Sequence, residues 1–95
     1  MSFAVSYHPL VVKEDIPKLG AAIRKRTKSA IETKLMTRPE VFGIPLRHSK
    51  SGDRKLRVGD YRVIFRIKGK KINIYLIEHR SVVYKMLMNR VRKEF

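Results

Sequence analysis

Apolar and polar residues alternate along three runs in the second half of the chain. The runs cover roughly Asp53 to Val58, Tyr61 to Lys68 and Lys71 to His79, and they are separated by Gly59-Asp60 and by a turn at Gly69. Glycine adopts positive φ without steric cost and aspartate tolerates it, so both separators suit tight hairpins. The pattern predicts a three-stranded antiparallel meander, and the third run is apolar almost throughout, as expected of an interior strand.

Each strand of this meander sorts its side chains onto two faces, because successive residues point to opposite sides. The middle run separates an apolar set from a mixed set: Val63, Phe65 and Ile67 against Arg62, Ile64 and Arg66. The first run divides in the same way, with Lys55 and Arg57 on the side of Arg62. We expect helices to cover the apolar face and these cations to line up on a second, uncovered face.

The first part of the chain predicts one strand and a short helix. Ser2 to Tyr7 alternates and is rich in β-favouring residues, and it is too short to stand alone, so it should join the meander. His8-Pro9 ends this strand, because proline cannot donate to a ladder. An approximate helical stripe then indicates a helix over roughly Leu10 to Leu19, shortened or bent by Pro17.

Two further helices complete the expected elements. After a reversal at Gly20, apolar residues recur at helical spacing from Ala21 to about Met36. Thr37 to Ser51 is punctuated by proline and glycine and predicts an irregular connection. A last amphipathic helix starts near Val82. Together these elements predict an α+β fold: an N-terminal strand, a helical hairpin, a meander that completes a curled four-stranded sheet, and a C-terminal helix.

Composition limits what this chain can be. Its 95 residues suit one domain over residues 1-95, with 43% hydrophobic residues for a single core. Because the chain has no cysteine and three histidines, we expect no disulfide, no thiol catalysis and no metal site. No apolar run approaches the roughly 20 residues that span a bilayer, and no signal-peptide pattern is present. We therefore expect a cytoplasmic protein without membrane association.

Charge changes the picture most. Lys and Arg total 23 against 8 Asp and Glu, a formal net charge of +15. Such an excess indicates an anionic partner, and the spread of cations over strands and helices favours nucleic acid over a membrane surface. A charge that serves solubility alone is the alternative. The long helix carries its own basic surface, which we interpret as a solvated face rather than an RNA contact: Arg24, Lys25, Arg26, Lys28 and Lys34.

Two motifs in this framework resemble the RelE branch of the RelE/ParE toxin superfamily. The first is Leu56-Arg57-Val58-Gly59-Asp60-Tyr61-Arg62-Val63-Ile64-Phe65, and the second is His79-Arg80-Ser81-Val82-Val83-Tyr84, which is similar to the family's His-Arg-x-x-Val-Tyr ending. The similarity covers essentially the whole chain. It implies a RelE-like fold and a toxin that acts as an endoribonuclease, cutting messenger RNA in the A site of a 70S-type ribosome without a metal or other cofactor. It also implies an acidic antitoxin that holds the toxin inactive in a hetero-oligomer.

The resemblance places four catalytic candidates on this sequence. Arg62 matches the family's catalytic arginine, which can donate two hydrogen bonds to the scissile phosphate. Lys55 matches a lysine that activates the nucleophile or stabilises charge. Arg80 matches a leaving-group acid or phosphate clamp, and charge stabilisation suits it better because arginine gives up a proton so reluctantly. Tyr84 matches an aromatic residue that stacks on a base and assists proton transfer.

Other polar residues surround these four. Cations of the strands and of the preceding loop are candidates for binding RNA: Arg54, Arg57, Arg66, His48 and Lys50. His79 is a tempting general base, because the unperturbed pKa of a histidine side chain lies near neutrality. Strand alternation nevertheless puts it opposite Glu78, so it need not share the face of Arg62, and we expect a structural or indirectly supporting role.

The chain departs from the family pattern at one position of the first meander strand. Where the best-known members carry another lysine two residues before Lys55, this chain has Asp53. Arg54 could replace that lysine only if the strand were locally bulged. The family's two-lysine arrangement is therefore in doubt here.

Two other functions stay open at this stage. A ParE-like gyrase inhibitor would use the same fold but act by binding a protein, and DNA damage with intact messenger RNA would indicate it. A non-catalytic RNA-binding homologue is favoured by Asp53, and salt-sensitive binding without a cut strand would indicate that.

Overall fold

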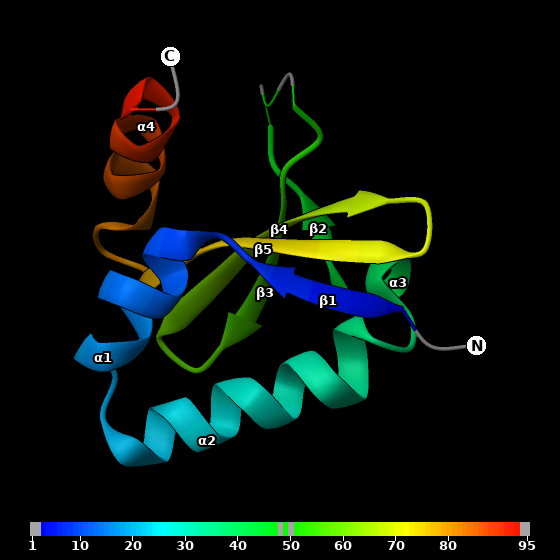
Figure 1. Ribbon diagram of the computed structural model, residues 1–95, viewed down its shortest axis with the longest axis horizontal. Helices are drawn as coiled ribbons and strands as arrows, with labels where there is room; N and C mark the ends of the chain where they lie inside the picture. Colours follow the sequence, from blue (N-terminus) through cyan, green and yellow to red (C-terminus); the bar gives the residue numbers. More distant parts are fainter. Residues whose placement is uncertain (1–2, 48, 50, 94–95) are drawn as a thin grey trace.

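The computed structural model describes residues 3–47, 49 and 51–93. It is a mixed α+β fold, as the sequence pattern predicts, with helices on both sides of one sheet (Figure 1). The elements in chain order are β1 (Ala4–Tyr7), η1 (Val11–Asp15), α1 (Ile16–Lys18), α2 (Ala21–Ala30), η2 (Ile31–Leu35), α3 (Pro39–Phe42), β2 (Ile44–Pro45), β3 (Arg54–Val58), β4 (Tyr61–Lys68), β5 (Lys71–His79) and α4 (Val83–Lys93).

The sheet has five strands in the order β1-β5-β4-β3-β2, one more than expected. Strands β3, β4 and β5 form the antiparallel meander, and β1 joins it by pairing parallel to β5, which makes β5 an interior strand. Both hairpin turns lie where the sequence puts them, with φ of 60° at Gly59 and 59° at Gly69. The additional strand, β2, consists of two residues that pair with the start of β3.

The prediction of an irregular connection over Thr37 to Ser51 is wrong for the first half of this stretch, because α3 and β2 lie there. Pro39 begins α3, where a missing N–H costs nothing. Gly43 then lets the chain pass against the sheet, since any side chain at this position would collide with the ring of Phe65. Elements of four and two residues are too short to leave a periodic pattern in the sequence.

The two helices of the hairpin both contain a π-helical turn. The first is η1, which leads directly into the three-residue α1 that holds Pro17, so this helix is short, as expected. The second is η2, which continues α2 without interruption, so one long helical segment spans the region expected for it. Among the described residues, no helix is long and apolar enough to cross a membrane.

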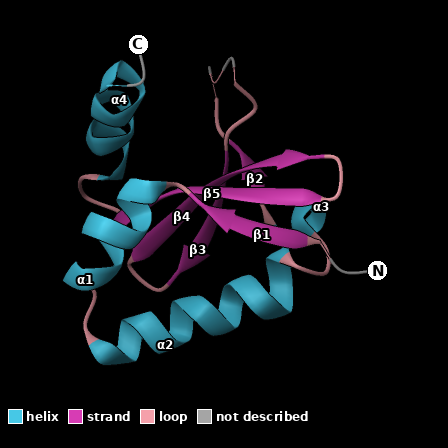
Figure 2. Cartoon of the chain, in the orientation of Figure 1, coloured by secondary structure: helices cyan, strands magenta, loops and turns pink. Residues whose placement is uncertain are grey.

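Figure 2 shows the sheet in magenta with the cyan helices around it. A hydrophobic cluster lies on each face of this sheet. On the first face, Val63 and Phe65 pack with Leu35 of η2 and other core residues, as expected. The second face is not uncovered, because Ile64 and Leu76 pack there under α4. The sequence does not predict this cover, because an amphipathic pattern shows that the C-terminal helix packs but not against which face. A register shift after Ile64 supports this second cluster, since it leaves Tyr75 as an extra residue of β5.

Candidate active site

A row of charged residues crosses the second face of the sheet beside α4. Arg57 of β3 pairs with Arg62 of β4, and Arg62 pairs with Glu78 of β5. Cross-strand partners share a face, and Lys55, two residues before Arg57, lies on that face too. Two arginines directly opposite each other repel, and an anion placed between them would relieve the repulsion. The expected alignment of these cations on one face is therefore present.

Lys55 and Tyr84 form a direct contact at the edge of this row. The Lys55 ammonium donates a hydrogen bond to the Tyr84 hydroxyl at 3.0 Å, and it lies 5.7 Å from the centroid of the ring. Tyr84 stands in the first turn of α4 and is 48% exposed. Two residues 29 positions apart in the sequence are thus joined where a ligand can reach both.

The Arg62 side chain folds back onto the β3–β4 hairpin. Its Nη1 donates to the carbonyl oxygens of Gly59 and Tyr61, both at 2.9 Å. These two bonds fix the guanidinium at the turn. Because a guanidinium carries five N–H donors, others than these two can serve a phosphate.

Arg80 reaches the same turn from the end of β5. Its backbone N–H donates to the Asp60 carbonyl oxygen at 2.8 Å, and its Nε lies 3.8 Å from an Asp60 carboxylate oxygen. Both side chains are well exposed, so this ion pair contributes little to stability. Arg62 and Arg80 therefore flank one hairpin turn.

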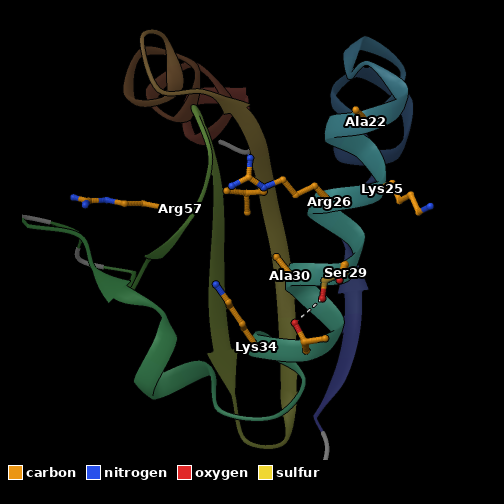
Figure 3. A pocket seen from close by; sticks show the side chains of 9 residues that line it. Ala22, Lys25, Arg26, Ser29, Ala30, Lys34 and Arg57 are labelled. Carbon is orange, nitrogen blue, oxygen red and sulfur yellow. Dashed lines mark hydrogen bonds between the residues drawn. The ribbon is translucent and has the colours of Figure 1, made fainter.

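A third arginine, Arg26, lies at this turn, although the sequence predicts it on a solvated face of the long helix. Figure 3 shows Arg26 pointing from α2 toward the sheet, whereas Arg57 points away from the helix. A Cβ at Gly59 would lie 2.9 Å from Arg26 Nη1, so this guanidinium rests on the glycine. Helical periodicity identifies the outer surface of α2 but not which of its cations the turn will meet.

Arg26 belongs to a groove of about 500 Å³ between the long helix and β3. The groove is lined by small and basic side chains: Ala22, Lys25, Arg26, Ser29, Ala30, Thr33, Lys34, Arg57 and Val58. Lys34 also points toward the sheet, and Lys25 points away (Figure 3). The basic surface of the long helix is therefore divided, with part of it turned toward the hairpin.

Two of the RNA-binding candidates, Arg54 and Arg66, have partners within the fold. Arg54 donates from Nη2 to the carbonyl oxygens of Glu40 and Gly43 at 3.1 and 2.8 Å, which ties β3 to the end of α3. It pairs with Phe65 across the strands and so lies on the opposite face from Lys55. The β3–β4 register is unbroken, so Arg54 does not reach the position of the absent lysine.

Asp53 takes part in a structural network instead. Its carboxylate accepts a 2.6 Å hydrogen bond from Arg66 Nε and a 2.9 Å bond from the Ser49 hydroxyl. The Arg66 guanidinium also lies 4.3 Å from the centroid of the Tyr75 ring. Arg66 is thus held within the fold at the far side of the second cluster from Arg62. The remaining candidates, His48 and Lys50, lie outside the described residues.

His79 lies on the face that alternation predicts. It pairs with Tyr61, with the two rings edge to face at 5.4 Å, and its Nδ1 is 2.8 Å from the Ser81 hydroxyl. These contacts lie on the first face of the sheet, away from Arg62. They fit the structural role expected for this histidine.

A smaller hollow of about 220 Å³ lies near Arg66, between β1, β4 and β5. Tyr7 lines it, and burial, together with the nearby charge of Glu32, raises the pKa of its hydroxyl.

Within the described ranges, no group of three or more His, Cys, Asp or Glu side chains could hold a metal ion.

The candidate site thus combines a cationic sheet face, a lysine–tyrosine hydrogen bond at its edge and a hairpin turn contacted by three arginines. A family model described as ParE toxin of type II toxin-antitoxin system, parDE, matches residues 5–84. The chain belongs to this family, within the RelE/ParE superfamily, and is a toxin of the type II toxin-antitoxin class. No curated protein matches the sequence.

Solved structures of RelE toxins share the fold. The toxin-antitoxin complex RelBE2 from Mycobacterium tuberculosis contains a chain 26% identical, with a TM-score of 0.76, over 84% of this chain and all of that one. The archaeal RelE–RelB complex from Pyrococcus horikoshii gives 28% identity and a TM-score of 0.61, over 84% and 97%. A mutant of the Escherichia coli toxin RelE in the free state gives 20% and 0.69, over 96% and 99%, which is likeness of fold alone.

Proposed function

We propose that this toxin is a ribosome-dependent endoribonuclease that cuts messenger RNA in the A site and so inhibits translation. The observation that carries the proposal is the Lys55–Tyr84 hydrogen bond of 3.0 Å on the sheet face that also holds Arg57 and Arg62. This face offers fixed positive charge and groups that exchange protons within one exposed surface. RNA cleavage by attack of a 2′-hydroxyl needs both.

The reaction we propose uses the RNA's own 2′-oxygen as nucleophile. This oxygen loses its proton and bonds to the adjacent phosphorus, and the bond from phosphorus to the 5′-oxygen breaks. The departing oxygen takes up a proton, so the products are a 2′,3′-cyclic phosphate and a 5′-hydroxyl. No cofactor enters this sequence.

Each candidate residue has a role in this scheme. Arg62, held at the turn by two carbonyl oxygens, stabilises the extra negative charge of the pentacoordinate phosphate. Arg80, beside the same turn, clamps a phosphate oxygen. The Lys55–Tyr84 pair relays a proton at the reacting oxygens, and the exposed Tyr84 ring stacks on a base.

The antitoxin we propose as the partner is an acidic protein. A surface with a net charge of +15 attracts an acidic, partly disordered segment that folds as it binds. The Mycobacterium tuberculosis and Pyrococcus horikoshii relatives were solved as toxin-antitoxin complexes. We propose that such an antitoxin covers the cationic face and stops the reaction.

The test is cleavage mapping on ribosomes programmed with a defined messenger RNA. The purified toxin should cut the message in the A site, and adding the antitoxin should prevent the cut. Removing one stabiliser of transition-state charge costs on the order of 100-fold or more in rate, so Arg62→Ala should lose at least that much. Lys28→Ala removes an exposed cation of α2 and should cut like wild type. Wild-type toxin that leaves the message intact would overturn the proposal.

Gyrase inhibition is the second candidate, because the matching family model is described by the name ParE. In this case the toxin would act by binding a protein. A supercoiling assay with purified gyrase separates the two functions. Inhibition of gyrase with an intact message on ribosomes would favour the second candidate.

A further inference from the structure

A buried ion pair joins the last turns of α4 to the body of the protein. Arg90 is 3% exposed and Asp15 is 1% exposed. Arg90 Nη1 donates to Asp15 Oδ2 at 2.8 Å, and Arg90 Nη2 donates to Asp15 Oδ1 at 3.0 Å. Glu14, next to Asp15, adds a contact at 3.9 Å. The pair is therefore bidentate, the geometry that fixes a guanidinium in one orientation.

The same two side chains continue the edge of the sheet where β1 stops. The ladder from β1 to β5 ends at Tyr7 and Ile74. Beyond that point, Arg90 donates to the carbonyl oxygen of Tyr75 at 2.9 Å, and Asp15 accepts from the N–H of Ile77 at 2.9 Å. The pair thus connects η1, β5 and α4 through groups that would otherwise lack partners at a buried edge.

The energetics favour an orienting role for this pair. Burial alone would lower the pKa of Arg90, but the hydrogen bonds and the charge of Asp15, together with Glu14, outweigh it and raise the pKa. A buried ion pair pays heavily for desolvation, so apolar residues of similar volume would often stabilise a fold equally well. Its particular contribution is direction, because hydrogen bonds orient and apolar contacts do not.

The direction of α4 decides where Tyr84 stands. Val83 is fully buried, and Arg90 follows it by seven residues, two turns later on the same side of the helix. Tyr84 lies about 100° around the helix from that buried side. Apolar contacts of Val83, Met86, Leu87 and Val91 hold the helix on the cluster, but such contacts are not directional and leave it some freedom to rotate and tilt. A directional bond at Arg90 removes this freedom and keeps Tyr84 toward Lys55.

We propose that Asp15 and Arg90 are positioning residues that orient α4 so that Tyr84 stays in contact with Lys55. The proposal rests on the proposed function for its effect on cleavage, but not for its effect on the contact itself. Both side chains are buried, whereas the Lys55–Tyr84 contact is exposed. They act through the helix.

The first test measures the contact without any activity. Arg90→Lys keeps the charge but cannot form the bidentate pair, and we expect the nuclear Overhauser effect between the Lys55 side chain and the Tyr84 ring to weaken strongly. Tyr84→Phe identifies the ring signals, and Lys85→Ala, an exposed change on α4, should leave the contact as in wild type. An unchanged contact in a folded Arg90→Lys chain would overturn the proposal.

The second test is a double-mutant cycle of cleavage rates on ribosomes. Arg90→Lys should slow cleavage on the order of 10- to 100-fold, as misplacement of a catalytic group does. It should slow cleavage little further in a Tyr84→Ala background, because the ring and the hydroxyl that Arg90 positions are already absent. Equal losses in the two backgrounds would mean that Arg90 does not act through Tyr84.

A double variant keeps the proposal testable if the single substitutions unfold the protein. Asp15→Asn combined with Arg90→Gln removes the ion pair without leaving an unpaired charge, and the two amides can still bond the Ile77 N–H and the Tyr75 carbonyl oxygen. This chain should remain folded and lose the Lys55–Tyr84 contact. If wild type cuts no RNA, the proposed function fails, while the contact measurement still decides the role of the pair.

Discussion

Asp53 is the residue at which this chain departs most clearly from the RelE pattern, and its contacts explain what it does instead. The side chain is 7% exposed, and it holds Arg66 at 2.6 Å while it also accepts a bond from Ser49. An aspartate at this position therefore organises the loop before β3 and the middle of β4. The second lysine of the family has no counterpart in Arg54, which points to the other face.

Asp53→Lys, which restores the lysine of the family, should destabilise the chain rather than activate it. The new ammonium would lie almost buried beside the Arg66 guanidinium, and breaking such a pair costs roughly 3 kcal/mol. Urea unfolding measures the loss. Glu40→Lys makes the same charge change at an exposed site and should shift stability by less than about 0.5 kcal/mol. Equal effects of the two changes would mean that the Asp53–Arg66 pair is not important to the fold.

Single residues also show how much of the candidate site can be predicted from the sequence. Alternation along β3 and β4 correctly grouped Lys55 with Arg62 and correctly separated His79, because a strand in regular register leaves its side chains only two directions. It could not predict that Lys55 meets Tyr84, since this contact depends on where α4 packs. It also missed Arg26, whose contact with Gly59 depends on the distance between a helix and a turn.

The β3–β4 hairpin is the element on which the candidate site is built. Gly59 permits its positive φ and gives room to Arg26, while its carbonyl oxygen holds Arg62. The β4–β5 hairpin has nearly the same φ at Gly69, with nothing within 4 Å of the place a Cβ would occupy. The two turns are thus alike in backbone and differ in what surrounds them.

Gly59→Ala and Gly69→Ala should therefore destabilise the chain to a similar degree but differ in function. Each forces alanine into the left-handed region at a cost of roughly 1 to 2 kcal/mol. Only Gly59→Ala also displaces Arg26, and it does so at the turn whose carbonyl oxygen holds Arg62. Only this change should therefore slow cleavage on ribosomes. Thermal unfolding and cleavage rates of both variants provide the comparison. If Gly69→Ala slows cleavage as much, the loss follows from stability and not from the arginines at the turn.

The elements differ in how well the sequence predicts them. The strands of the meander were predicted with the bounds of β4 and β5, because long alternating runs between glycine turns have one interpretation. The short α3 and β2 were missed, since neither is long enough for a period. The four-stranded count was wrong for this reason. The cover over the second face was missed because an amphipathic helix shows that it packs but not against what.

At the scale of the whole molecule, the buried acids sharpen the contrast between interior and surface. Asp15 and Asp53 are both buried, and each pairs with an arginine inside the fold. The charges of these two aspartates are therefore neutralised by ion pairs within the protein. The cations of β3, β4 and α2 remain at the surface to act on a partner, and the field there is set by position as much as by the net charge of +15.

The salt dependence of RNA binding can distinguish position from net charge. A single-stranded RNA whose 2′-hydroxyl is blocked at the cut site binds without being cleaved, and its affinity can be measured over a range of salt. Each cation that contacts a phosphate contributes about 0.7 to the slope of log affinity against log salt. Arg57→Ala should therefore make the slope shallower by about this amount, because Arg57 lies in the cationic row beside Arg62. Lys28→Ala removes the same charge from the long helix and should leave the slope unchanged. If both variants reduce the slope equally, RNA is attracted by the overall charge of the toxin, and the row on the second face is not its binding surface.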